Sequence, residues 1–180
     1  AGEMERNRYY STQEKLALFL LGRSFATQAS GEWSAEIAPS GKAQGDAQRP
    51  FDHGAWVPLM HLFPQADVPV VQVALPVDAG PAQVHALGAA LRPLAPQGVL
   101  LVGSGSMTHN LGEFMGGEDD RSEPTPYVQE FSRWVEAAVQ RHDVPALLDY
   151  RRLAPHALRA HPTDEHFLPL FFALGAAPQA

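Results

Sequence analysis

Three segments of the chain each place a histidine among glycine, proline or acidic residues. They are residues 51–56 (FDHGAW), 103–110 (GSGSMTHN) and 161–170 (HPTDEHFLPL). Imidazole is the commonest neutral metal ligand, and it gains and loses a proton near pH 7 without assistance. Glycine, proline and acidic residues are typical of places where a chain turns and side chains converge. The three segments therefore predict a site that binds a metal ion or transfers protons.

His109 follows closely after the small residues Gly103, Ser104, Gly105 and Ser106. Small residues allow a ligand to approach the backbone closely. From the local sequence alone, the favoured interpretation is a histidine that lies in a turn and is satisfied by the neighbouring Asn110.

Glu165 and His166 follow a proline and a threonine. We expect a helix over residues 163–174 with Thr163 as its N-cap, so that both residues lie on the first turn. In the simpler interpretation, Asp164 and Glu165 complement the helix dipole and His166 faces water.

His53 stands between an aspartate and a glycine. The carboxylate of Asp52 could fix the tautomer of the His53 imidazole and raise its basicity. We interpret Trp56, three residues further on, as a core residue rather than a platform for stacking.

The elements that must position these residues follow an α/β pattern. Residues 68–75 and 98–103 are short apolar runs typical of buried strands, and residues 81–94 between them have helical spacing. A strand, a helix and a strand in this order predict two parallel strands, with ligands bound beyond their carboxyl ends, where residues 103–110 lie. Further helices are expected over residues 125–141 and 146–153. The predicted fold is a parallel or mixed sheet flanked by helices.

The N-terminal region differs in its residue pattern from the α/β part of the chain. Ser11–Glu14 form a capping-box pattern, and the apolar residues Leu16, Phe19, Leu20 and Phe25 predict an amphipathic helix. Residues 29–50 are polar and rich in glycine, as in a linker. We therefore divide the chain into a helical segment with a linker, residues 1–48, and a domain over residues 49–180.

Composition narrows the range of partners. The net charge is −7 and the 13 basic residues are scattered, which argues against nucleic acid or an anionic membrane as partner. No apolar stretch approaches the ~20 residues of a membrane span. The chain has no cysteine, so it has neither disulfides nor a thiolate metal site. We predict a cytoplasmic protein.

The three histidine segments together resemble the class III extradiol ring-cleavage dioxygenases, in particular the DOPA 4,5-dioxygenase-like branch. The resemblance runs from about Pro50 to Ala177 and does not include residues 1–45. It implies an enzyme that uses non-haem Fe(II) and O₂ to open a catecholic, DOPA-like ring. Zn(II) is a second candidate metal because imidazole ligands discriminate weakly against it.

The resemblance also implies roles for the histidines. His166 corresponds to a metal ligand, with Glu165 as the rival ligand because other branches supply a glutamate from this region. His109 corresponds to a metal ligand in some members and to the catalytic base in others. His53 corresponds to a residue that guides the substrate or O₂, and His161 to a residue that lines the pocket.

Two motifs of that family are missing. The family carries further metal-binding histidines in a His-Gly-Ser-Pro motif and a Ser-Ala-His-Trp motif near its start, whereas the first histidine here is His53. We therefore expect the C-terminal half of a dioxygenase domain, inactive alone unless a partner chain or a homodimer supplies the missing ligands. The alternatives are a non-enzymatic binding module of the Memo type and a zinc-dependent hydrolase, although no GxSxG or HExxH motif supports the latter.

Overall fold

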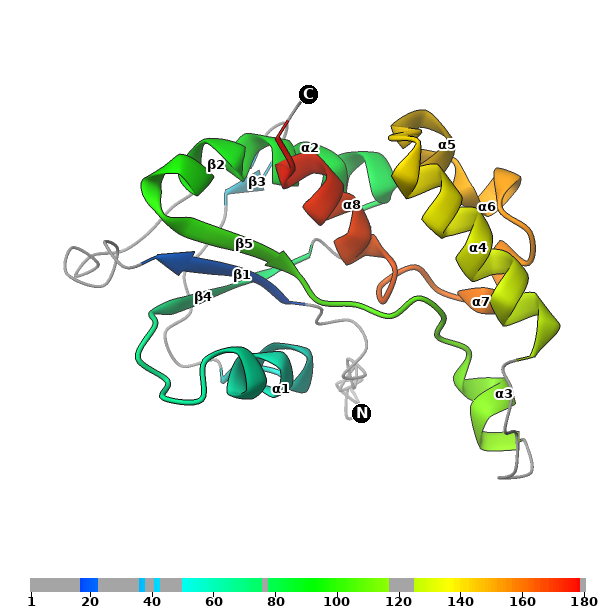
Figure 1. The fold of residues 1–180 in the computed structure, drawn as a ribbon, viewed down its shortest axis with the longest axis horizontal. Coiled ribbons are helices and arrows are strands. Elements are labelled where there is room, and N and C mark those ends of the chain that lie inside the picture. Colours follow the sequence, from blue (N-terminus) through cyan, green and yellow to red (C-terminus); the bar gives the residue numbers. More distant parts are fainter. Residues whose placement is uncertain are drawn as a thin grey trace, which may run out of the picture.

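The computed structural model describes the backbone of residues 17–22, 36–37 and 41–42 and, with side chains, residues 50–75, 78–113 and 125–178; of residues 114–116 it describes the backbone. A central three-stranded sheet has helices on both faces, with α2 and α8 on one face and α1 on the other (Figure 1). The remaining helices gather beside one end of this layered unit.

The sheet has the strand order β4-β1-β5, formed by β4 (Val70–Ala74), β1 (Ala17–Gly22) and β5 (Val99–Gly103). Both pairings between these strands are antiparallel, which differs from the predicted parallel or mixed sheet. β4 and β5 do run in the same direction, because each is antiparallel to β1. β2 (Glu36–Ile37) and β3 (Gly41–Lys42) form a separate antiparallel pair.

β1 corrects the prediction of an N-terminal amphipathic helix. Residues 17–22, with the sequence ALFLLG, form a strand that pairs along both of its edges. A continuous apolar run of this length is typical of a central strand and cannot be distinguished from a buried helix by periodicity alone. Capping-box residues 11–14 and Phe25 lie outside the described residues.

Helices α2 (Pro81–Leu91) and α8 (Leu168–Ala176) pack closely on one face of the sheet. Glycines make this approach possible: a Cβ atom on Gly88 would lie 2.1 Å from the carbonyl oxygen of Phe172. A Cβ atom on Gly175 would lie 2.0 Å from the carbonyl oxygen of His85. The predicted helix over residues 81–94 is confirmed through Leu91 and continues as a 3₁₀ helix, η2 (Arg92–Gln97).

The C-terminal helix starts later than predicted. Residues 163–167 form turns, in which the carbonyl oxygen of Asp164 accepts hydrogen bonds from the N–H groups of Phe167 and Leu168. Pro169 stands in the first turn of α8, where its missing N–H is not needed, and so it does not interrupt the helix. The predictions that Thr163 is an N-cap and that His166 lies on a helical turn are therefore wrong.

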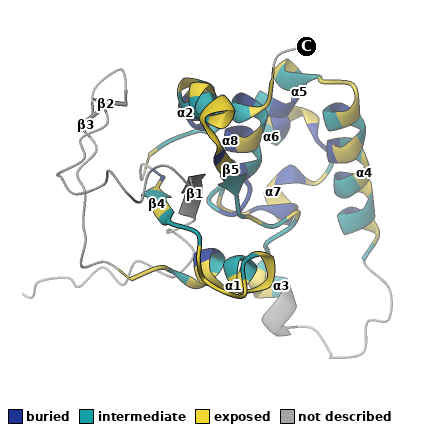
Figure 2. Ribbon diagram, turned by 60° about the vertical axis from the view of Figure 1, so that its left-hand side comes forward, coloured by how far each residue is buried: buried dark blue, intermediate teal, exposed yellow. Residues whose placement is uncertain are grey.

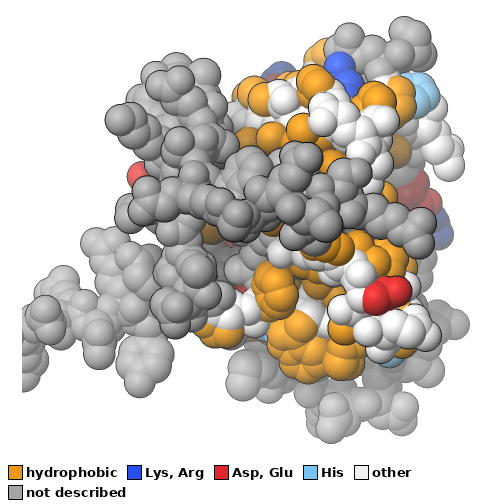
Figure 3. Space-filling view, turned by 90° about the vertical axis from the view of Figure 1, so that its left-hand side faces the viewer, with side chains coloured by type: hydrophobic (Ala, Val, Ile, Leu, Met, Phe, Trp, Pro, Cys, Tyr) orange, Lys and Arg blue, Asp and Glu red, His pale blue; other side chains and the backbone are white. Residues whose placement is uncertain are grey.

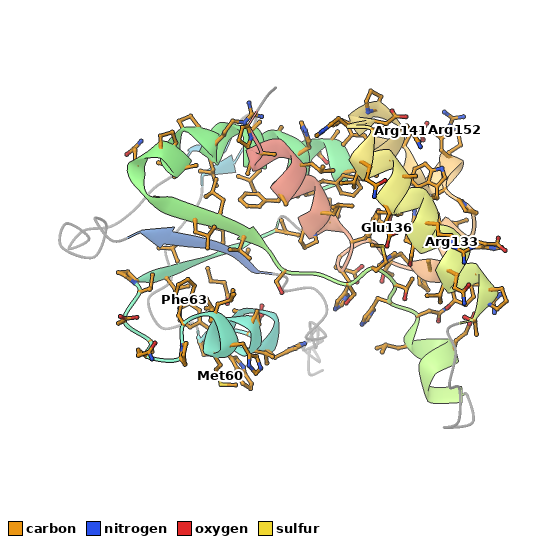
Figure 4. The ribbon with its side chains drawn as sticks, in the orientation of Figure 1. Met60, Phe63, Arg133, Glu136, Arg141 and Arg152 are labelled. Atoms are coloured by element: carbon orange, nitrogen blue, oxygen red, sulfur yellow. The ribbon has the colours of Figure 1, made fainter. Side chains whose placement is uncertain are left out.

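A helical cluster completes the core beside α8. It consists of α4 (Pro126–Gln140), α5 (Val144–Leu148), α6 (Tyr150–Leu153) and α7 (Ala157–Ala160), so the predicted helix over residues 146–153 is divided in two. Phe131, Tyr150 and Phe171 are fully buried here and are in mutual contact with Phe167. Figure 2 shows the buried side of α4 facing this core, and the labelled Arg133 and Arg141 lie on its outer side in Figure 4.

Helix α1 (His53–Leu62) covers the other face of the sheet. Ala55 is fully buried against Val70 and Val102, whereas Met60 is 52% exposed and points away from the sheet (Figure 4). Apolar side chains gather over this part of the surface in Figure 3. Trp56 is 45% exposed, so the prediction that it is a core residue is wrong. No helix among the described residues is long and apolar enough to cross a membrane.

Candidate active site

The three histidine segments meet at the end of β5. The segment 104–110 leaves this strand and leads into α3 (Leu111–Gly116). The N-terminus of α1 approaches this segment, because a Cβ atom on Gly54 would lie 3.9 Å from Ser104 Oγ. Asp52 caps α1, with its Oδ1 accepting a hydrogen bond from the N–H of Ala55 at 3.1 Å. The chain thus brings His53, which is exposed, to the same end of the sheet.

Backbone hydrogen bonds join the segment after β5 to the residues before α8. The N–H of Ser106 donates to the carbonyl oxygen of His166 at 2.8 Å, and the N–H of His109 donates to that of Ala160 at 2.8 Å. A Cβ atom on Gly105 would lie 2.5 Å from the carbonyl oxygen of His166. Only glycine therefore fits at position 105 without a shift of the backbone.

This arrangement stacks the imidazoles of His109 and His166. Their ring centroids are 3.5 Å apart and their planes differ by 6°. His166 is 8% exposed, and its Nδ1 is buried without a hydrogen-bond partner among the described residues. The sequence predicted both residues as members of one site, and the structure places them in direct contact.

His166 is held in its neutral form. Burial is the main reason why its pKa is lowered to about 4, and the neighbouring His109, His161 and His53 add to the effect. Glu165 acts in the opposite direction and raises the pKa. A neutral imidazole is the form that binds a metal ion, so at pH 7 His166 is ready to act as a ligand.

His161 is fully buried behind this pair. Its Nε2 lies 2.8 Å from the carbonyl oxygen of Met107, and its ring contacts those of Phe131 and Phe167. Burial is the main cause of its lowered pKa, so this imidazole too is neutral at pH 7.

Two polar networks that sequence reasoning missed support the site. Arg151 donates to the carboxylate of Asp164 and, through the same Nη1, to the carbonyl oxygen of His161 at 3.1 Å. The hydroxyl of Tyr150 also donates to Asp164, at 3.0 Å. The pairing of Arg151 with the aspartate of the HPTDEH motif could not be found from sequence because the two residues are 13 positions apart without a helical spacing.

The second network holds the start of α3. The Nδ2 of Asn110 donates to the carbonyl oxygen of Arg159 at 2.8 Å, while the Arg159 guanidinium pairs with Glu113 and lies over the ring of Tyr127. Asn110 therefore anchors the end of the loop to α7. The local interpretation, in which Asn110 satisfies His109, has no support among these contacts.

The described residues do not complete a metal site. Within the described ranges, no group of three or more histidine, aspartate and glutamate side chains is arranged to hold a metal ion. A non-haem iron site of the facial-triad type needs three protein ligands. His109 and His166 supply two imidazoles, so the side chains described for this chain do not by themselves fit such a site.

Residues 34–180 match the family described as the catalytic LigB subunit of aromatic ring-opening dioxygenase. The chain belongs to this family. The match begins before Pro50, and therefore earlier than the motifs alone indicated.

Curated relatives of the chain are also extradiol dioxygenases by name. The chain is 40% identical over 132 residues to the 4,5-DOPA dioxygenase extradiol of Beta vulgaris, covering 73% of this chain and 48% of that protein. It is 34% identical over 132 residues to the 4,5-DOPA dioxygenase extradiol of Escherichia coli K12, covering 70% of this chain and 46% of that protein. The chain thus spans about half the length of the curated relatives it matches.

A solved structure supports the fold. The crystal structure of an uncharacterized Escherichia coli K12 protein matches with a TM-score of 0.61 and 30% sequence identity, covering 74% of this chain and 55% of that one. Together with the family match, this likeness shows an α/β fold of the LigB dioxygenase type.

Proposed function

We propose that this chain forms part of an extradiol ring-cleavage dioxygenase that acts on a catechol of the DOPA type with O₂ and Fe(II). The observation that carries the proposal is the stacked His109–His166 pair at the end of β5. Membership of the LigB family and the names of the relatives support the reaction class. Zn(II) is the alternative metal.

In this proposal each histidine has a distinct task. His166 is a metal ligand, because burial keeps it neutral and leaves its Nδ1 without another partner among the described residues. His109 is a second ligand or the base that accepts a proton from a catechol hydroxyl. His53, exposed at the N-terminus of α1, guides the substrate or O₂ into the site. Glu165 is the rival ligand to His166.

We further propose that this chain does not turn over substrate alone. Its described side chains offer two imidazoles where three ligands are needed. The missing ligands would come from a further segment, a partner chain or a homodimer. We place the protein in the cytoplasm, as the sequence predicts, with no nucleic-acid or membrane partner.

The first experiment measures oxygen uptake. The purified chain is loaded anaerobically with Fe(II), freed of excess metal and mixed with DOPA, catechol or protocatechuate. We expect no tight iron binding and no uptake. Oxygen uptake with formation of a coloured semialdehyde would show that the site is complete, and would overturn the proposal that the chain is inactive alone.

A chimera tests the reaction itself. Residues 50–178 of this chain replace the matching part of the Beta vulgaris relative, which then supplies the remainder of its own domain. We expect the chimera to open the ring of DOPA, and His109→Ala and His166→Ala each to lower kcat by at least about 100-fold. His61→Ala is the control, because His61 is exposed on α1 and lies outside the site.

A non-enzymatic module of the Memo type is the second candidate function. The observation that favours it is the lack of a three-ligand group among the described side chains. If the folded chimera binds Fe(II) but shows neither a catechol-dependent change in its absorption spectrum nor oxygen uptake, this candidate replaces ring cleavage.

A further inference from the structure

We propose that His161 is a positioning residue, whose side chain holds the segment 104–110 in the conformation that stacks His109 on His166. Its effect on catalysis rests on the proposed function, whereas its effect on the conformation of the segment can be measured without any activity.

Three hydrogen bonds tie a short stretch of this segment to the residues before α8. Ser106 and His109 use their backbone N–H groups, which bond to the carbonyl oxygens of His166 and Ala160, each at 2.8 Å. Between them, the carbonyl oxygen of Met107 lies 2.8 Å from Nε2 of His161. The outer two bonds join backbone to backbone and are open to most residue types, so among these three the middle one depends on a particular side chain. The Asn110 side chain, which donates to the carbonyl oxygen of Arg159, holds the far end of the segment.

Met107 does not anchor the segment by itself. The residue is 41% exposed, so its side chain is not enclosed in the core. The hydrogen bond to its carbonyl oxygen is therefore the contact that defines the position of Met107, two residues before His109.

The chemistry of the contact fixes the tautomer of His161. A carbonyl oxygen only accepts hydrogen bonds, so Nε2 must carry the hydrogen, and in the neutral ring Nδ1 is then unprotonated. Nδ1 is buried and has no hydrogen-bond partner among the described residues. Leaving such an atom unsatisfied is unfavourable, and a phenylalanine or leucine would fill an aromatic pocket without this disadvantage. The useful atom of His161 is therefore the Nε2–H donor.

The surroundings make His161 a rigid donor. It is fully buried, and its ring centroid lies 5.7 Å from that of Phe131 and 4.8 Å from that of Phe167. Its own carbonyl oxygen accepts a hydrogen bond from Arg151 at 3.1 Å. The ring and the backbone of His161 are thus held by Phe131 and Arg151 of the helical cluster and by Phe167 before α8. The hydrogen bond from its Nε2 therefore links this cluster to the segment that carries His109.

Two substitutions distinguish the effect of the hydrogen-bond donor of His161 from the effect of the volume of its side chain. His161→Gln keeps an N–H donor at a similar distance from Cα, whereas His161→Leu fills the pocket without a donor. Hydrogen exchange of the Ser106 and His109 backbone amides is measured in all three proteins. We expect exchange of these amides to be roughly 5- to 10-fold faster in His161→Leu than in the wild type, and within about 2-fold of the wild type in His161→Gln. Amides of α2 are the internal control and should not change.

The imidazoles provide a second measurement by NMR. Long-range ¹H–¹⁵N spectra should show His161 with hydrogen on Nε2 in the wild-type protein, and the His109 and His166 ring signals should move in His161→Leu but not in His161→Gln. Hydrogen on Nδ1 of wild-type His161 would overturn the proposal even if His161→Leu does not fold. Unchanged exchange at His109 in folded His161→Leu would overturn it as well.

In the chimera, His161→Leu should lower kcat more than it raises KM, and His161→Gln should restore most of kcat. A chimera that fails to open any ring, while the exchange and NMR results hold, would reject the proposed function and leave the positioning role of His161 intact.

Discussion

At the scale of single residues, burial beside a second imidazole keeps His166 uncharged. Two imidazoles with ring centroids 3.5 Å apart repel each other strongly when both are charged. Burial, and to a lesser extent the neighbouring His109, lower the pKa of His166 to about 4. His166 therefore stays neutral at neutral pH.

This lowered pKa predicts a loss of stability in acid for the metal-free chain. An unfolded histidine has its pKa near 6.5, whereas folded His166 is protonated only near pH 4. Between these values the unfolded state binds the extra proton, so the free energy of unfolding falls as the pH drops from 6.5 to 4, by about 3 kcal/mol in all for this residue. Urea unfolding at several pH values measures this dependence.

His166→Gln is the reference for that measurement, because glutamine does not titrate. Carboxylates also titrate in this pH range, so the difference in slope between the two proteins isolates the histidine. Equal slopes for both proteins between pH 6.5 and 4 would contradict the prediction.

Two neighbouring arginines offer a matched comparison. Arg151 donates to the Asp164 carboxylate, to Tyr150 Oη and to two carbonyl oxygens of residues 161–162, and its side chain is 35% exposed. Arg152 pairs with Asp149 at the surface, with 72% of its side chain exposed. We expect Arg151→Ala to lower the free energy of unfolding by about 1–3 kcal/mol and Arg152→Ala by less than about 1 kcal/mol.

Chemical denaturation of the two alanine variants measures this difference. A loss for Arg152→Ala that equals the loss for Arg151→Ala would show that the contacts of Arg151 with the HPTDEH motif add nothing to stability.

The convergence of the candidate residues could be predicted, whereas their contacts could not. The family resemblance implied that the three segments form one site, and 103–110 was expected at the ligand-binding end of the sheet because it follows a strand. His109 and His166 do touch. The buried location of His161 beneath Met107 depends on how α4 and α8 pack, which residue types and spacing do not encode. Trp56 is a further example: its apolar side chain suggested the core, but the sheet side of α1 is already occupied by Ala55 and Leu59.

At the scale of elements, the close approach of the segment 104–110 to the start of α8 depends on a glycine. A Cβ atom on residue 105 would lie 2.5 Å from the carbonyl oxygen of His166, which is backbone and cannot rotate away. We expect Gly105→Ala to lower the free energy of unfolding by about 1–3 kcal/mol, and to shift the NMR signals of the His109 and His166 rings.

Gly112→Ala is the matched control. Residue 112 lies in α3, and the nearest atom to a new Cβ would be Asn110 Oδ1 at 3.4 Å, an ordinary contact. Alanine is favoured over glycine in a helix, so this variant should be neutral or more stable by up to about 1 kcal/mol. If Gly105→Ala behaves like this control, the segment is not held as closely as the geometry indicates.

Element types were predictable where the pattern was periodic and less so where it was uniformly apolar. The helices over residues 81–91 and 126–140 are confirmed within a few positions, because their apolar residues recur at helical spacing. The run of residues 17–22 is apolar at every position up to Gly22, and only its pairing with β4 and β5 decides that it is a strand. Sheet order is a long-range property, which also explains why the antiparallel pairing was missed.

At the scale of the whole molecule, the division of the chain at residue 48 stays a prediction, and β1 provides a way to test it. Five residues of β1 pair with β4 and five with β5, and no direct pairing joins β4 to β5. A chain that begins at residue 50 would lack this central strand. The backbone N–H and C=O groups of both neighbours would lose their partners, and α1 would lose its contact with β1.

We therefore expect residues 50–180 alone to lose cooperative unfolding, measured by circular dichroism during urea titration, although the helical cluster around Phe131 and Tyr150 can keep part of its helix content. A chain that begins at residue 14 keeps β1 and should unfold cooperatively, with a urea midpoint close to that of the full chain. If residues 50–180 unfold with the same midpoint as the full chain, β1 is not needed for the fold, and the division at residue 48 describes an independent domain. If they do not, the N-terminal region belongs to the same folding unit as the histidines, because β1 joins the strand that carries the His109 segment to the strand beneath α1.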